Sequence, residues 1–105
     1  MTDGLADRQL DALGDSTRRR TLELLRTSEQ SVAELTAALP VSQSAVSQHL
    51  KVLKDAGLVI DRAEGRRRLY RVDLDGVAAI RSYVDQFWDD VLVAFASFAD
   101  QEPRS

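Results

Sequence analysis

The chain has 105 residues, no cysteine and a formal net charge of −3. This length fits one domain, residues 1–105, and excludes a barrel or a two-domain enzyme; the lack of cysteine excludes disulfides, thiolate nucleophiles and thiolate metal ligands. With neither a secretory signal nor an 18-residue apolar span, we expect a cytoplasmic protein without a membrane partner.

The charge is divided unevenly along the chain. Residues 15–73 hold eleven Lys and Arg and eight Asp and Glu, a net charge of +3, whereas the two flanks hold three against nine, a net charge of −6. Because only the face near phosphates must be positive, a basic middle in an acidic protein is a weak indication of local contact with nucleic acid.

The first part of the chain predicts two helices. A short amphipathic stretch, interrupted by Gly14, presents three leucines: Leu5, Leu10 and Leu13. A second helix begins at Asp15 or Ser16, either of which can cap it by accepting a hydrogen bond from a backbone N–H. Arginines occupy positions 18–20 in its first two turns, where the helix dipole disfavours cations. A phosphate or carboxylate partner and simple solvation of these side chains are both compatible with that position.

A third and a fourth helix follow in close succession. Ser31 and Glu34 have the spacing of a capping box, in which each side chain satisfies the backbone N–H of the other residue. Pro40 stops this helix, and only a tight turn fits before Ser42, the N-cap of the next one. Gly57, a residue that adopts the left-handed conformation easily, ends it. Two helices joined so closely predict a helix-turn-helix, over about residues 31–57.

The two faces of the fourth helix differ in chemistry. Val46, Leu50 and Leu53 recur at helical spacing and are expected to face a core. The other side carries hydroxyls, amides and one cation: Ser44, Ser47, Gln48 and Lys51, with Ser42 and Gln43 at its start. Such groups can donate to and accept from base edges in the major groove of DNA. An ordinary polar surface helix is the alternative, and this helix alone does not decide between them.

After the fourth helix the pattern becomes that of strands. Residues 58–60 are apolar, Glu64-Gly65 is a turn signal, and residues 67–72 alternate basic and apolar side chains. They predict a two-stranded hairpin over about residues 58–73. Four side chains are expected to face the helices: Leu58, Ile60, Tyr70 and Val72. A hairpin beside a helix-turn-helix is a wing, and Arg66, Arg67 and Arg68 at its tip are placed to meet phosphates or the minor groove.

A last helix is predicted over about residues 74–99, with Asp73 as its cap. It is apolar over too wide an arc for a small monomer to cover, so we predict a homodimer with twofold symmetry. The predicted interface combines this helix with the first one: Leu5, Leu10, Leu13, Val84, Phe87, Trp88, Val91, Leu92 and Phe95. Use of the aromatic rings as core is compatible with a dimer, because the core would continue across the interface.

Five motifs resemble those of one family, the ArsR/SmtB repressors, over roughly residues 10–95. The motifs are Ala12-Leu-Gly-Asp-Ser-Thr-Arg18, the run from Leu22 to Leu25, Val41-Ser-Gln-Ser-Ala-Val-Ser-Gln-His-Leu50, Leu53-Lys-Asp-Ala-Gly-Leu-Val59 and Gly65-Arg-Arg-Arg-Leu-Tyr70. The resemblance implies a mostly α-helical winged helix-turn-helix protein, a homodimeric transcriptional repressor that binds an imperfect palindrome in double-stranded DNA. It also implies that the polar face of the fourth helix and the wing arginines meet DNA. His49 either packs at the edge of that helix or bonds a phosphate.

The chain departs from the metal-sensing members that it resembles. Their Cys-x-Cys pair on the third helix corresponds to Ser31 and Ala33, which excludes thiolate sensing. The zinc ligands of other members correspond to Asp73, Asp75, Gln86 and Asp89, with both histidines replaced. We therefore expect a metal-independent member without a cofactor, while ion binding by the three acidic positions stays open.

Two classes of function are compared. The first is sequence-specific DNA binding by a transcriptional regulator. The alternative is a winged-helix dimer that serves as a protein-interaction module. The polar face of the fourth helix argues against this alternative, because such modules present exposed aromatic or aliphatic anchors. An enzyme is not expected, since a single histidine and no cysteine leave no paired nucleophile and base. No residue identifies an effector.

Overall fold

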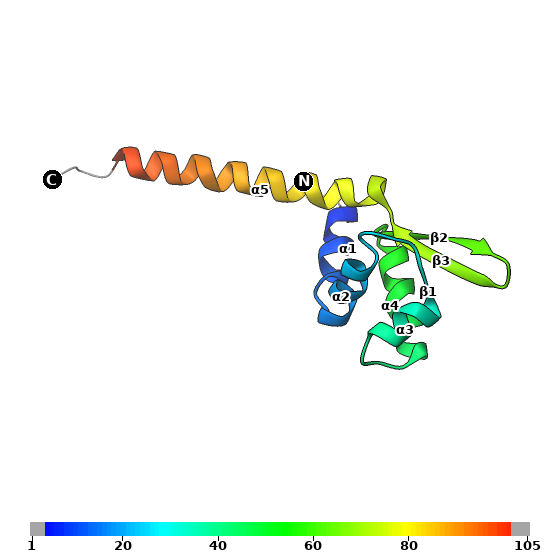
Figure 1. Cartoon of the computed structure of the whole chain (residues 1–105). Coiled ribbons are helices and arrows are strands. Elements are labelled where there is room, and N and C mark those ends of the chain that lie inside the picture. The colour runs from blue at the N-terminus through cyan, green and yellow to red at the C-terminus, as the bar shows by residue number, and fades with distance from the viewer. Residues whose placement is uncertain (1–3, 102–105) are drawn as a thin grey trace.

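The computed structural model describes residues 4–101, and the side chains of residues 4–97. The described residues form five helices and three strands (Figure 1). In chain order these are α1 (Gly4–Ala12), α2 (Ser16–Leu24), β1 (Gln30–Ser31), α3 (Val32–Ala38), α4 (Gln43–Asp55), β2 (Val59–Glu64), β3 (Arg67–Val72) and α5 (Leu74–Gln101). This is the predicted winged helix-turn-helix order, with one short strand added before α3.

Side chains cap the helices where the sequence places them. Asp15 accepts a hydrogen bond from the backbone N–H three residues on, at 3.0 Å, and Ser42 does the same at 3.1 Å. Ser31 and Glu34 form both bonds of the capping box, at 3.2 and 2.9 Å. Gly57 follows α4 with a φ of 77°. The predicted helix starts and the end of α4 are therefore confirmed.

The apolar stripe of α4 lies at the centre of the core. Val46, Leu50 and Leu53 are almost completely buried, and they pack with residues from α1, α3 and the start of the sheet. The buried cluster contains Ala12, Leu25, Leu35, Leu39, Val46, Leu50, Leu53, Ala56, Leu58 and Val59. Because the inner face of α4 is fixed in this way, its polar face points away from the core.

The three strands form one antiparallel sheet in the order β1-β3-β2. Val59 pairs with Val72 and Glu64 with Arg67, so Gly65 and Arg66 form a two-residue turn. Gly65 has a φ of 62°, the left-handed conformation that such a turn needs at its first position. The short strand β1 was not predicted, because two polar residues carry no alternating pattern; it pairs only with β3.

The register corrects the predicted inner face of the hairpin. Side chains of directly paired residues point to the same side of a sheet, so Val59 shares a side with Val72 and Tyr70, whereas Ile60 lies on the opposite side. Val59 is 1% exposed, and Ile60 is only half-buried. The expectation for Leu58, Tyr70 and Val72 holds, since these side chains pack on the core. Strand β2 starts at Val59, one residue later than predicted. Because successive side chains of a strand point to opposite sides of the sheet, an error of one residue places the wrong side chains on the inner side.

The arginines at the start of α2 have partners that were not foreseen. Arg18 Nε donates to the carbonyl oxygen of Ala12 at 2.5 Å, and Arg19 Nη1 donates to that of Leu13 at 2.7 Å. These carbonyls belong to the C-terminal end of α1, where helical C=O groups lack intrahelical partners and cations are favoured. Neither a phosphate nor a carboxylate is needed to explain the two arginines.

A contact between two glycines joins α5 to the end of α4. A Cβ added to Gly76 would lie 1.6 Å from the carbonyl oxygen of Gly57. The buried side chain of Gln9 in α1 donates to the carbonyl oxygen of Gly76 at 2.6 Å, and Asp73 caps α5 by accepting from Gly76 N at 3.1 Å. The predicted role of Asp73 is confirmed. This junction ties three helices together without room for a side chain at Gly76.

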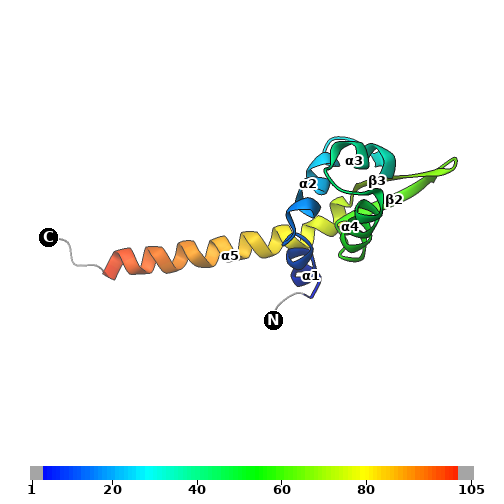
Figure 2. The same ribbon diagram turned by 90° about the horizontal axis from the view of Figure 1, so that it is seen from below.

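Beyond this junction α5 leaves the body of the protein. Its outer half projects away from the other elements in both views, and the wing points in the opposite direction (Figures 1 and 2). The molecule is accordingly 68 Å long and only 26 and 21 Å across. None of the helices within residues 4–101 combines the length and the apolar content needed to cross a bilayer.

We expect Gly76→Ala to lower the free energy of unfolding by about 2 kcal/mol or more, because the methyl group overlaps backbone that cannot move independently. Urea unfolding at one fixed protein concentration measures this change. Gly4→Ala is the control, since an added Cβ at Gly4 meets no atom within 4 Å. Equal unfolding midpoints for Gly76→Ala and the unmodified chain would contradict the close approach.

Candidate nucleic-acid interface

The polar face of α4 is open to solvent. Gln43, Ser44, Ser47, Gln48 and Lys51 are all exposed, as is the capping residue Ser42. Their hydroxyls and amides make a surface that both donates and accepts hydrogen bonds, which is what base edges in the major groove require.

His49 lies at the edge of this surface rather than in it. The ring is half-buried, and its Nδ1 is 3.5 Å from Arg18 Nη1 on α2. The imidazole therefore faces the neighbouring helix α2. Of the two roles considered for it, packing at the helix edge agrees with this position, and contact with a phosphate stays a prediction.

Lys51 forms an ion pair with Asp55, one turn further along α4, at 2.8 Å. The two side chains are 76% and 64% exposed. Ion pairs in such solvent contact contribute little to stability and are screened by salt. Lys51 can thus exchange its carboxylate for a phosphate at small cost.

A groove of about 400 Å³ separates the start of α4 from the wing. Gln43 lines one side, and Arg66, Arg67 and Arg68 line the other, with the first residues of α3 and Tyr70 between them. The start of α4 also adds the positive end of its helix dipole. The groove is therefore suited to an anion such as a phosphate of the DNA backbone.

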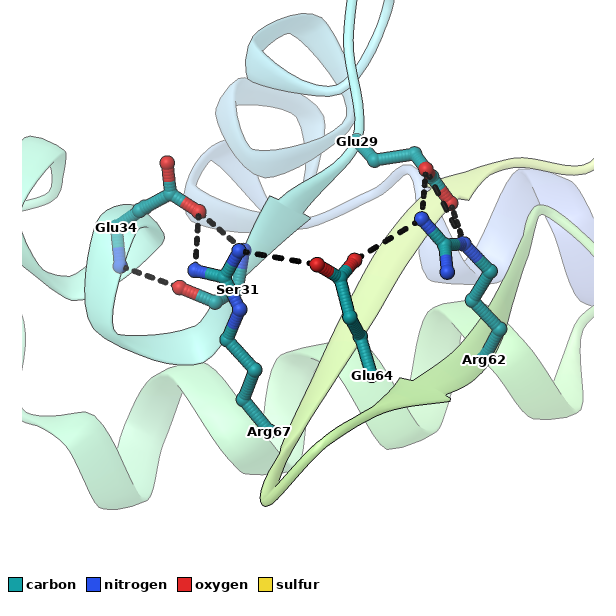
Figure 3. Close-up of polar contacts among 6 residues, drawn as sticks. All are labelled: Glu29, Ser31, Glu34, Arg62, Glu64 and Arg67. Carbon is teal, nitrogen blue, oxygen red and sulfur yellow. Dashed lines mark hydrogen bonds and ion pairs between the residues drawn. The ribbon is translucent and has the colours of Figure 1, made fainter.

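An alternating chain of charges covers the side of the wing that faces α3 (Figure 3). Glu29 holds Arg62 with two oxygens at 2.9 Å each, and Arg62 reaches Glu64 at 3.1 Å. Glu64 lies 3.8 Å from Arg67, which lies 4.0 Å from Glu34. The last carboxylate is the one in the capping box of α3. The chain of charges therefore links the wing to the start of α3.

On the opposite side of the wing a single carboxylate, that of Asp61, contacts two cations. Asp61 Oδ1 lies 2.8 Å from Lys54 Nζ on α4, and its Oδ2 lies 2.6 Å from Arg68 Nε on β3. The side chain of Asp61 is only 7% exposed. Hydrogen bonds from Lys54 and Arg68 hold the pKa of Asp61 below its ordinary value.

The three wing arginines thus differ in availability, which the sequence did not reveal. Arg67 and Arg68 are engaged by carboxylates, whereas within the described part of the chain no ion pair or hydrogen bond involves the side chain of Arg66 in the turn. Sequence reasoning also missed Asp61 and Glu64. Their opposite charges to Arg68 and Arg67 are visible in the sequence, but only the strand register brings them together.

The positions that correspond to metal ligands have other roles or none. Ser31 caps α3 and Asp73 caps α5. Within the described residues, no three His, Asp or Glu side chains come close enough together to hold a metal ion.

Six of the nine residues predicted for a dimer interface lie along α5, whereas Leu5 and Leu10 lie on α1 and Leu13 packs against the core. Phe87, Trp88, Leu92 and Phe95 are between 52% and 66% exposed, and the rings of Phe87 and Trp88 meet edge to face at 5.9 Å. Val84 and Leu10 are exposed, and Leu5, Leu13 and Val91 are half-buried. α1 buries Ala6, Gln9 and Ala12 instead of its leucines. Exposed side chains of this size in one patch are typical of an interaction surface.

Comparison with known proteins identifies the family. Residues 15–61 match the family described as "Bacterial regulatory protein, arsR family". The chain is also 50% identical over 96 residues to the HTH-type transcriptional regulator Rv2034 of Mycobacterium tuberculosis, covering 91% of this chain and 90% of that protein. This chain belongs to the ArsR family.

Two solved structures extend the likeness of this ArsR family chain to its fold. A possible transcriptional regulator for arsenical resistance is 46% identical, with a TM-score of 0.73 over 90% of this chain and 97% of the other. The homodimeric winged helix-turn-helix DNA-binding domain Mb0332 of Mycobacterium bovis is 32% identical, with a TM-score of 0.67 over 84% of this chain and 82% of the other. The predicted fold and function class, DNA-binding regulation of transcription and not catalysis, are confirmed. The interaction-module alternative is not favoured.

We expect the free energy of unfolding to fall as the pH drops below about 4. Hydrogen bonds lower the pKa of Glu29, Glu34 and Asp61 in the folded state, so their contribution is present above their unfolded pKa values and is lost as the pH falls through the folded ones. Urea unfolding between pH 7 and pH 3 measures the loss. Glu29→Gln removes one such group and should flatten the pH dependence; an identical dependence in both proteins would contradict the role of the Arg62 pair.

Proposed function

We propose that this ArsR family regulator is a homodimeric repressor in the cytoplasm, whose two α4 helices enter successive major grooves of an imperfect palindromic operator. The observation that carries this proposal is the exposed face of α4, whose hydroxyls and amides stand opposite a completely buried apolar stripe. The helix is thus held firmly on one side and presents hydrogen-bonding groups on the other.

Within that face we assign the reading of bases to the amides and hydroxyls of Gln43, Ser44, Ser47 and Gln48. These side chains are uncharged and exposed, and they lie in the first turns of α4, the part of a recognition helix that contacts base edges. Lys51 and Arg66 supply phosphate contacts, because neither is held in a buried ion pair. Ser42 keeps its role as the cap of α4.

A dimer is supported by the exposed apolar surface of α5 and by the homodimeric state of the related Mb0332 domain. In a twofold dimer the same patch of each subunit contacts its copy, so one apolar stripe along α5 provides both halves of the interface. Such a dimer would present two copies of α4 to DNA. Half-sites about 34 Å apart, one helical turn of DNA, are then expected.

Selection from a pool of random DNA duplexes tests this function without knowledge of the operator. We expect the purified dimer to enrich an imperfect palindrome, and to bind it about 10³-fold or more tightly than scrambled DNA. The affinity difference should persist at two salt concentrations. A pool without a common motif, bound equally well after scrambling, would disprove sequence-specific recognition.

Replacing both Gln43 and Gln48 by Ala should reduce discrimination between the selected and scrambled duplexes by about 10-fold to 100-fold per amide that reads a base. Affinity for scrambled DNA should change little, because neither residue carries charge. Titration of both duplexes at one salt concentration measures the ratio. Unchanged discrimination would remove the base-reading role from this face.

Arg66→Ala is the matched control for that experiment. It should weaken binding to every sequence and reduce the slope of log affinity against log salt by about 0.9 per subunit, the value for one phosphate contact. Discrimination should stay close to that of the unmodified protein. The two variants therefore separate base reading from phosphate binding.

Changing both Trp88 and Leu92 to Asp should convert the dimer to monomers, because the interface would bury two unpaired charges on each subunit. We expect the dimer dissociation constant to rise by at least about 100-fold, as measured by sedimentation equilibrium. Asp89→Asn, which alters an exposed polar residue of α5, is the control and should leave the dimer intact. A variant that stays dimeric would place the interface elsewhere.

A further inference from the structure

Asp61 is unusual among the charged groups of the wing because it is almost fully buried. Its side chain is 7% exposed, whereas the carboxylates of Glu29, Glu34 and Glu64 on the other side are 29%, 54% and 48% exposed. A buried carboxylate is costly unless each oxygen has a partner. Asp61 meets this condition, since one oxygen contacts Lys54 and the other contacts Arg68.

The partners of Asp61 come from two different elements. Lys54 is in the last turn of α4, and Arg68 is in β3, while Asp61 itself is in β2. In the sheet, Asp61 pairs with Tyr70 and Ala63 pairs with Arg68, so Asp61 and Arg68 are diagonal neighbours on one side of the hairpin. The three residues join the recognition helix to both strands of the wing. The Lys51–Asp55 pair, by contrast, lies within one helix and orients nothing.

We propose that Asp61 is a positioning residue for DNA binding that fixes the angle between α4 and the wing and withholds Lys54 and Arg68 from the phosphates. This inference rests on the proposed function, because it assigns a role within the same DNA-binding surface. The wing is a lever that extends from Asp61 to the turn at Gly65, about 13 Å at the rise of an extended strand. A tilt of about 10° would then displace the tip by about 2 Å, which is enough to break a hydrogen bond to a phosphate.

The second part of the role concerns charge. The side chains of Lys54 and Arg68 are 51% and 54% exposed, so both could reach toward an anion if they were released. An ion pair at 2.8 Å keeps Lys54 on Asp61, and a hydrogen bond at 2.6 Å keeps Arg68 there. The carboxylate therefore limits attraction to any DNA sequence while it supports the geometry needed for one sequence.

Asp61→Asn tests both parts, because it keeps the size of the side chain and removes the charge. We expect binding to scrambled DNA to tighten, with a log–log salt slope steeper by about 0.9 for each cation released per subunit. Affinity for the selected duplex should not rise in proportion, so discrimination should fall by about 10-fold. Amide hydrogen exchange in residues 59–72 should become faster without DNA. Asp85→Asn on α5, at a 69% exposed carboxylate, removes the same charge and should change none of these quantities.

Arg68→Gln is the second variant and covers the case in which Asp61→Asn does not fold. Because Arg68 is withheld from DNA, its loss should leave the salt slope unchanged, in contrast to Arg66→Ala, while wing amides exchange faster. A slope reduced by about 0.9 would instead show that Arg68 binds a phosphate, and would overturn the proposal.

Failure of the positioning role and failure of the proposed function give different results. Wild-type discrimination, salt slope and wing exchange in Asp61→Asn would overturn the positioning role while leaving the proposed function intact. An unmodified protein that does not discriminate between duplexes would overturn the proposed function; hydrogen exchange in the absence of DNA then decides the link between α4 and the wing by itself. Faster exchange in the variant supports that link, and unchanged exchange disproves it.

Discussion

The approach of Gly76 to Gly57 is the constraint on which the arrangement of the elements depends. The backbone of α5 touches the carbonyl of the residue that ends α4, so no side chain larger than hydrogen fits at Gly76. Strand β2 begins two residues after Gly57, and Gln9 brings α1 to the same point. The helix proposed to read DNA, the wing and the helix proposed for dimerisation are all anchored there. Their relative positions are set by backbone contact, which is stiffer than contact between long side chains.

Electrostatics in the wing explains how an acidic chain can be suited to DNA. The basic middle of the sequence does not act as a free positive patch, because Glu29, Glu34, Asp61 and Glu64 hold three of its arginines. These carboxylates act as structural groups that tie the wing to α3 and α4. We propose that phosphates meet Arg66 at the tip of the wing and Lys51 on α4, neither of which is held in a buried ion pair. In that proposal, a small number of phosphate contacts limits affinity for DNA of any sequence, and discrimination is left to the uncharged face of α4.

The role proposed for the outer half of α5 depends on burial of apolar surface and not on electrostatics. The outer half of α5 projects away from the body of the protein (Figure 2), and its large aromatic and aliphatic side chains are exposed. Burial of this surface against a second copy would contribute stability in proportion to the area removed from water. It would also hold the two copies of α4 at a fixed separation. The same residues would therefore serve stability and the geometry of recognition in the proposed dimer.

The sequence by itself determined the helices, their caps, the helix-turn-helix, the polar face of α4 and the membership of the family. These features depend on interactions between residues at most four positions apart, such as Ser31 with Glu34, or on periodicity within one helix. Only the tertiary structure decided the added strand β1, the inner face of the hairpin, the partners of Arg18 and Arg19, and the difference between Arg66 and its two neighbours. Each of these depends on which distant backbone or carboxylate a side chain meets. In a strand, a change of one residue in the starting point reverses which side chains face the core. Composition and spacing along the chain do not determine that starting point.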